Sequence, residues 1–300
     1  GHEAFVEMRA RGANVTDLIV LVVAADDGVR PQTIEVINRA KFTNTPLIVA
    51  INKIDKETAN SMRVKQELAE HGVLTEDWGG KTIAVEISAK QNKGIDDLLE
   101  MILLAAEVEN YKANPNGKTL GTVIESHTSL GHGSVATIIV QSGTLHVGDT
   151  MVAGASYGRV KSLEDEKGKK LKLAGPSTPV QISGFSELPE VGDILQTVES
   201  LEQARTIATT IQKKNRSHKL QIRKGLQGDS TNKTLNIILK SDVAGSLEAI
   251  KQSLAKLKND EVTINILSEG VGEVNESDVL LASNSKGTVI AFNVKTNPKA

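Results

Sequence analysis

Apolar runs alternate with helical periodicities over residues 1–114 of the chain. The continuous run from Asp17 to Ala24 is typical of a strand that is buried on both faces of a parallel sheet. Further strands are predicted at 46–51 and 82–87, with helices at 31–41, 63–71 and 95–106. This βαβαβα order predicts a parallel sheet covered by helices, in which ligands bind at the carboxyl ends of the strands.

From residue 115 to about 199 the hydrophobic period falls to two, and glycine-bearing turns become frequent. Six short strands at such spacing favour a small antiparallel barrel. The predicted strands are 122–126, 135–140, 150–153, 159–163, 180–183 and 194–197. The tripeptide Val-Gly-Asp precedes a strand twice, at 147–149 and 191–193, which supports the strand boundaries.

A basic connector at 200–233 follows the predicted barrel. A helix is predicted over 200–210, and six cations then crowd the connector: Lys213, Lys214, Arg216, Lys219, Arg223 and Lys224. Two interpretations stay open, a solvated linker and a salt-sensitive contact with RNA phosphates.

An α/β pattern returns from residue 234 to residue 300. Strands are predicted at 235–239, 262–267 and 288–294, and helices at 243–257 and 277–282. The expected fold class is therefore multidomain α/β plus β: a parallel sheet, an antiparallel β-barrel and a second α/β domain of βαβαβ order.

Composition excludes several classes of function. The 35 basic and 37 acidic residues give a formal net charge of −2, so there is no global electrostatic case for binding nucleic acid. The chain has no cysteine and only 2% aromatic residues, which excludes thiolate metal sites and disfavours a base-stacking platform. No apolar stretch reaches the roughly 18 residues of a membrane helix. We expect a soluble, cytoplasmic protein with neither membrane nor DNA as a partner.

Two strand ends carry polar motifs that fit a guanine base. Asn52-Lys53-Ile54-Asp55 follows the strand at 46–51, and Ser88-Ala89-Lys90 follows the strand at 82–87. A carboxylate at Asp55 can accept hydrogen bonds from the N1–H and the exocyclic amine of guanine together, a pattern that adenine lacks. Asn52 would tie the two loops, and the stems of Lys53 and Lys90 would lie along the base. Asn and Asp also favour plain turns, but two motifs at two strand ends agree on a guanine pocket.

The phosphate-binding half of such a site is missing from the sequence. Gly80-Lys81-Thr82 and Gly117-Lys118-Thr119 lack the first glycine of G-x-x-x-x-G-K-[ST], because Thr75 and Lys112 stand there. Gly131-His132-Gly133 precedes a β run, so we interpret it as a hairpin, and Gly270-Val271-Gly272 as a turn. The histidines show no metal-ligand spacing, and we expect no metal site.

Several segments carry a resemblance to a known family. Gly1-His2-Glu3 resembles the end of the D-x-x-G-H-E switch of translational GTPases, and residues 26–33 resemble the loop after their next strand. Residues 133–148, 241–246, 268–272 and 276–279 are similar to bacterial and organellar translation initiation factor 2. The resemblance covers essentially the whole chain, in family order. It implies a partial P-loop-GTPase-like sheet, a β-barrel domain and an α/β domain.

The resemblance also implies roles for individual residues. Gly1 and His2 would contact GTP, with His2 aligning the attacking water, although we prefer to regard His2 in this chain as a residue near a chain end without that role. Asn52, Lys53, Asp55, Ser88 and Lys90 would surround the guanine, and the Ala89 amide would donate to its O6. GTP and GDP are the expected ligands, with Mg²⁺ expected only in the full-length protein.

We expect a fragment of a translation initiation factor that promotes initiator tRNA binding and ribosomal subunit joining. Its partners would be both ribosomal subunits, and the initiator tRNA through a domain not present here. Because the phosphate loop is missing, we expect no GTP hydrolysis by these residues alone and binding at about millimolar level at best. The alternative is a non-enzymatic ribosome-binding module with a silent G-domain remnant.

Overall fold

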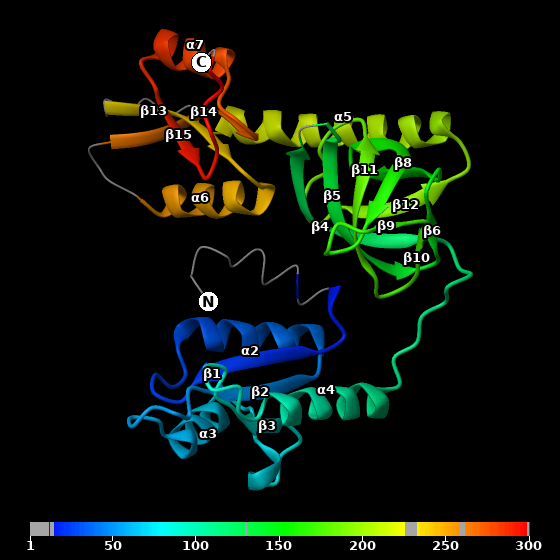
Figure 1. Ribbon diagram of the computed structural model, residues 1–300. Coiled ribbons are helices and arrows are strands. Elements are labelled where there is room, and N and C mark those ends of the chain that lie inside the picture. The colour runs from blue at the N-terminus through cyan, green and yellow to red at the C-terminus, as the bar shows by residue number, and fades with distance from the viewer. Residues whose placement is uncertain (1–11, 13–14, 130, 226–232, 258–261, 299) are drawn as a thin grey trace. The chain divides into compact units, whose positions relative to one another are not determined.

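The computed structural model describes residues 12, 15–129, 131–225, 233–257, 262–298 and 300 (Figure 1). The chain divides into two compact units, Gly1–Lys112 and Ala113–Ala300. The predicted fold class is confirmed: the structure contains a parallel sheet, a closed antiparallel barrel and a second parallel sheet.

A three-stranded parallel sheet forms the centre of the first unit. Its order is β1 (Ile19–Ala24), β2 (Leu47–Asn52) and β3 (Ile83–Glu86), with Ile19 beside Leu47 and Ile48 beside Ile83. The connections contain α2 (Pro31–Thr43), α3 (Ser61–Glu70) and the short 3₁₀ helix η2 (Glu76–Trp78), and α4 (Ile95–Glu109) follows β3. The central strand β2 is the most deeply buried, as its continuous apolar sequence predicts.

The helices of this unit begin and end at residues suited to those places. Pro31 opens α2, where its missing N–H costs no hydrogen bond, and Asn44 ends that helix in the left-handed conformation. Asn60 caps α3 by accepting a hydrogen bond from the Arg63 amide. These signals fix the loops that follow β1 and β2 between well-defined helix ends.

The apolar residues of α4 are less buried than the sequence pattern indicates. None of its residues is buried, and Leu103 and Val108 are 71% and 76% exposed. In the described part of the chain β1 pairs only with β2, and Val22 of β1 is 57% exposed. An apolar pattern predicts one face of a helix but does not say which surface covers it.

The second unit begins with a closed barrel of six main strands. These are β4 (Leu120–Ser129), β5 (Gly133–Ser142), β7 (Thr150–Ala153), β8 (Ser156–Glu164), β11 (Pro179–Phe185) and β12 (Ile194–Val198). They pair in the order β11-β5-β4-β12-β7-β8, and the pairing of β8 with β11 closes the barrel. The sequence predicted all six, but not the two-residue strands β6 (Leu145–His146), β9 (Lys170–Leu171) and β10 (Leu173–Ala174), which are too short to show a period.

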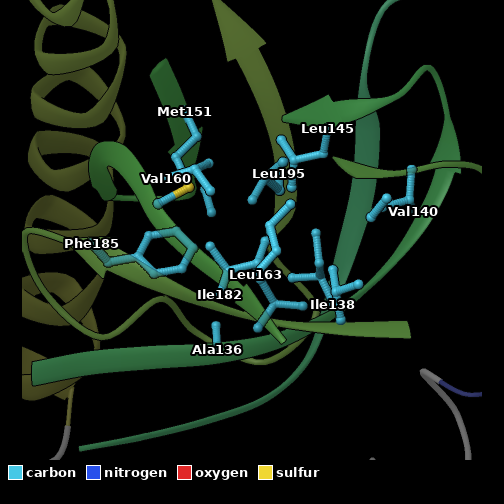
Figure 2. Packing of buried hydrophobic residues seen from close by; sticks show 14 residues of the cluster. Ala136, Ile138, Val140, Leu145, Met151, Val160, Leu163, Ile182, Phe185 and Leu195 are labelled. Atoms are coloured by element: carbon cyan, nitrogen blue, oxygen red, sulfur yellow. The ribbon is translucent and has the colours of Figure 1, made fainter. Parts of the chain in front are cut away.

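Alternating side chains of the barrel strands fill its interior. Ile138, Leu163, Ile182 and Leu195 are fully buried there, and Met151 and Phe185 fill one side of the same cluster (Figure 2). The period of two therefore reports the inward face of each strand.

The rest of the second unit consists of a long helix and a parallel sheet. Helix α5 spans Leu201–Gly225, so the basic segment at 213–224 lies on a helix and not in an irregular connector. Lys and Arg are good helix formers, and the first turns of α5 are anchored by buried Ala204 and Ala208 beside Val152.

The final sheet has the predicted βαβαβ order. Its strands are β13 (Lys233–Ser241), β14 (Val262–Val271) and β15 (Thr288–Phe292), connected by α6 (Ala244–Lys256) and α7 (Glu276–Ser285). The order β14-β13-β15 is parallel throughout. None of the helices in the described residues is both long and apolar enough to cross a membrane.

Removing a side chain from the barrel interior tests whether this cluster holds the barrel together. We expect Leu163→Ala to lower the free energy of barrel unfolding by about 2–5 kcal/mol, because the side chain is fully buried. Leu173→Ala is the matched control, since Leu173 is 54% exposed and should cost about 0.5 kcal/mol. Hydrogen exchange of barrel peptides in increasing denaturant measures both. Equal losses for the two variants would contradict the assigned core.

Candidate nucleotide-binding site

The two predicted guanine motifs lie at the same edge of the first sheet. Asn52 is the last residue of β2, and Ser88 lies just beyond β3, where Ile87 N–H still donates to the Ile51 carbonyl at 2.8 Å. Parallel strands end on one side of their sheet, so the turn after β2 and the loop after β3 are neighbours. The loop after β3 is narrow, because Ser88 and Lys93 exchange two backbone hydrogen bonds of 2.9 and 3.0 Å.

The side chain of Asn52 joins these two loops. Its Oδ1 accepts a hydrogen bond from the Lys53 amide at 2.7 Å and a second from the Ala89 amide at 3.0 Å. This is the tie between loops that the sequence predicted for Asn52. The Ala89 amide, which was predicted to donate to guanine O6, is thus engaged by Asn52, and donation to a base requires that this hydrogen be shared.

The carboxylate of Asp55 is held by the loop after β3. Asp55 Oδ1 accepts a hydrogen bond of 2.7 Å from Ser88 Oγ, and the same Oγ accepts from the Gln91 amide at 3.2 Å. Ser88 is buried, whereas Asp55 is exposed and open to a ligand. The Ser88 hydrogen bond lowers the pKa of the Asp55 carboxyl, and the charges of Lys90 and Lys56 act in the same direction. Asp55 is therefore an oriented, ionised acceptor.

Lys53 has an unusual backbone and a paired ammonium group. Its φ of 66° lies in the left-handed region, which residues with a Cβ rarely adopt. Its Nζ lies 3.3 Å from Asp26 Oδ1 and 3.4 Å from Asp27 Oδ2. The neighbouring carboxylates of Asp26 and then Asp27 raise the pKa of Lys53, so this ammonium is charged.

The structure brings together most of the residues that the sequence selected. Asn52, Lys53, Asp55, Ser88 and Ala89 form one connected set, and Lys90 is exposed in the same loop. Gly1 and His2 lie outside the described residues.

Asp26 and Asp27 belong to this edge of the sheet, and the sequence interpretation gave them no role. Both lie in the loop after β1, separated by Ala25 from its last residue Ala24, which pairs with Asn52. The signal that could have found them is their position, because acids at the end of a third parallel strand must reach the same edge.

The glycine motifs that the sequence analysis rejected as phosphate-binding loops lie in segments that lead into strands. Gly80-Lys81-Thr82 lies between η2 and β3, and Gly117-Lys118-Thr119 precedes β4, so neither opens a helix. Gly131 and Gly133 lie in the hairpin that connects β4 to β5. A pyrophosphate cradle needs the N-terminus of a helix, and these segments lead into strands.

A parallel sheet with polar loops at its carboxyl edge, followed by a six-stranded barrel, is the architecture of translational GTPases. Three family models match consecutive parts of the chain. The Elongation factor Tu GTP binding domain matches residues 1–107, and Elongation factor G domain 2 matches 118–198. Translation-initiation factor 2 matches 208–300.

Individual relatives agree over the whole chain. A protein from Caldanaerobacter subterraneus subsp. tengcongensis, named Translation initiation factor IF-2, is 55% identical across 100% of this chain and 44% of the relative. The protein of that name from Clostridioides difficile is 53% identical across 100% of this chain and 48% of the relative. The crystal structure of GDP-bound aIF5B from Aeropyrum pernix gives a TM-score of 0.58 at 25% identity, covering 99% of this chain and 57% of that chain.

The chain belongs to the translation initiation factor IF-2 family. It spans a little under half the length of these two curated relatives.

Replacing Ser88 tests how the Asp55 carboxylate is held. In Ser88→Ala we expect the pKa of Asp55 to rise toward its ordinary value, because the largest lowering contact is lost. A lowered folded pKa stabilises the fold above the unfolded value of about 3.9, and this stabilisation is lost as the pH falls through the folded pKa. Ser88→Ala should therefore reduce the stability that is lost on acidification. A carboxyl ¹³C titration measures the pKa of Asp55.

The matched control is Ser156→Ala, which removes a serine hydrogen bond to the Glu187 carbonyl in the second unit. It should leave the titration of Asp55 unchanged. An unaltered Asp55 pKa in Ser88→Ala, with the amide resonances of the loop intact, would show that Ser88 does not set the charge of this carboxylate.

Proposed function

We propose that this chain is part of a translation initiation factor that binds GTP and GDP through the loops after β2 and β3. The observation that carries the proposal is the pair of hydrogen bonds to Asn52 Oδ1, which join the turn of Asp55 to the loop of Ser88 and Ala89. The family supports the same ligand class, since a match to a GTP-binding domain covers residues 1–107.

The residues present fit a guanine base. An exposed carboxylate at Asp55 offers two acceptor oxygens, which suit the adjacent N1–H and exocyclic amine of guanine. The adenine edge presents an acceptor at N1 and would leave the carboxylate facing a lone pair. Asn52 and Ser88 orient the turn and the carboxylate, so the loops need little rearrangement to receive the base.

The phosphates and Mg²⁺ need groups beyond this edge of the sheet. Mg²⁺ in nucleotide sites is bound by a few protein oxygens together with phosphate oxygens and water. The described residues contain no cluster of three or more His, Asp or Glu that could hold a metal ion. When bound beside phosphates, Mg²⁺ would neutralise their charge, whereas the part of this chain is to recognise the base.

The proposed cellular role is guanine-nucleotide-dependent promotion of ribosomal subunit joining and initiator tRNA binding. Two relatives named Translation initiation factor IF-2 support it, and so does the likeness to GDP-bound aIF5B. A non-enzymatic ribosome-binding module with a silent G-domain remnant is not favoured, because the relatives match the first unit as fully as the second. A catalytic role of His2 stays a prediction.

Exchanging the carboxylate of Asp55 for an amide tests the assigned ligand. In a longer polypeptide that carries a phosphate-binding loop, Asp55→Asn should weaken GDP binding by about 100-fold and favour xanthosine diphosphate. The physical reason is that an Asn side chain accepts from N1–H but donates to the C2 carbonyl of xanthine. Calorimetric titration with both nucleotides measures the preference.

Asp17→Asn is the matched control for this exchange. Asp17 is exposed and lies before the amino end of β1, at the opposite edge of the sheet. It should leave both affinities unchanged. Equal affinity of Asp55→Asn for the two nucleotides would remove the basis of the guanine assignment.

A further inference from the structure

The loop after β1 is joined by its backbone to the turn that presents Asp55. Ala25 N–H donates to the Asn52 carbonyl at 2.7 Å, and Asn60 N–H donates to the Ala25 carbonyl at 3.0 Å. The pairing of β1 with β2 therefore continues one step into the site. Asp26 is the next residue along this loop.

The remainder of the loop is also fixed. Gly28 has a φ of 75°, which favours glycine, and the Val29 amide donates to Glu67 Oε2 of α3 at 2.6 Å. The carboxylate of Asp26 is thus held between an ordered backbone and an anchored turn. This carboxylate can therefore hold the side chains of the lysines that contact it.

Asp26 holds both ends of the Asp55 turn. Its Oδ1 lies 3.3 Å from Lys53 Nζ, and its Oδ2 accepts a hydrogen bond from Lys56 Nζ. Lys56 N–H in turn donates to the Lys53 carbonyl at 3.2 Å, which closes the turn with Asp55 inside it. One carboxylate therefore links the two lysines that flank the base-recognition residue.

Asp27 is less suited than Asp26 to link the two lysines. Its side chain is 47% exposed, against 13% for Asp26, so water and salt screen its charge more strongly. It also divides its oxygens between Arg30 at 3.0 Å and Lys53 at 3.4 Å, and it has no contact with Lys56.

The conformation of Lys53 makes such support necessary. A left-handed backbone is unfavourable for a lysine, so it persists only where surrounding contacts hold it. Asn52 Oδ1 holds the amide of Lys53, and Asp26 holds its ammonium group. Loss of either contact should let the turn relax toward an ordinary conformation.

We propose that Asp26 is a positioning residue of the guanine site, which fixes the turn of Asp55 through Lys53 and Lys56 and so slows the release of bound nucleotide. The inference rests on the proposed function, because it assumes that this turn receives a guanine. The proposal requires no contact between Asp26 and the nucleotide. Its effect passes through the two lysines.

Nucleotide release from three matched Asp→Asn variants tests the proposal. The protein is a longer polypeptide that carries a phosphate-binding loop, and the probe is a fluorescent GDP chased with unlabelled GDP. We expect Asp26→Asn to release GDP about three to ten times faster, in the range of a partly buried charged contact. Asp27→Asn should have a smaller effect. Asp77→Asn, whose ion pair with Lys65 lies elsewhere in the unit, should have none.

A double-mutant cycle separates positioning from a merely structural role. If Asp26 acts through the lysines, Asp26→Asn should change release little in a background of Lys53→Met and Lys56→Met. The proposal would be overturned if the effects of Asp26→Asn and of the two lysine substitutions on the release rate multiplied independently. It would also be overturned if Asp27→Asn accelerated release more than Asp26→Asn. Unchanged release in Asp26→Asn, with nucleotide still bound, would refute this inference alone. Failure of the unmodified protein to bind GDP would refute the proposed function.

Discussion

The register of β2 between its two parallel neighbours is the constraint on which the site depends. Ala24 pairs with Asn52, and Ile51 pairs with Glu86, so all three strands reach the same edge together. A slip of one residue in β2 would turn Asn52 to the other face of the sheet and separate its Oδ1 from the Ala89 amide. Because β2 is buried on both faces, such a slip would also force its apolar side chains to repack on the opposite face of the sheet.

This constraint explains why much of the site could be predicted from sequence. The apolar runs at 46–51 and 82–87 locate two strand ends, and parallel strands must end together, so Asn52, Asp55 and Ser88 had to be neighbours. The contacts of Lys53 could not be predicted in the same way. Whether its ammonium lies along a base or against Asp27 depends on a side-chain conformation and on a loop 26 residues away.

The fold features that were predicted are likewise those that follow from the local sequence pattern. The six main barrel strands follow from a period of two, because alternate residues of the strands fill the barrel interior. The continuation of α5 to Gly225 and the exposure of the α4 residues do not follow from local pattern. Helix length in a polar segment depends on small differences in propensity, and burial depends on which surface is nearby.

The charges around the turn bear on how the proposed site would divide base recognition from phosphate binding. Lys53 and Lys56 each lie within ion-pair distance of a carboxylate, and Arg30 lies 3.0 Å from Asp27. A cation that is paired with a carboxylate presents a weaker field to a phosphate than an unpaired cation does. The acids after β1 therefore stabilise the conformation of the turn and weaken its positive potential. In the proposed function, selectivity would come from the hydrogen-bond pattern that Asn52 and Asp55 present, and attraction of the phosphates would depend on groups outside this turn.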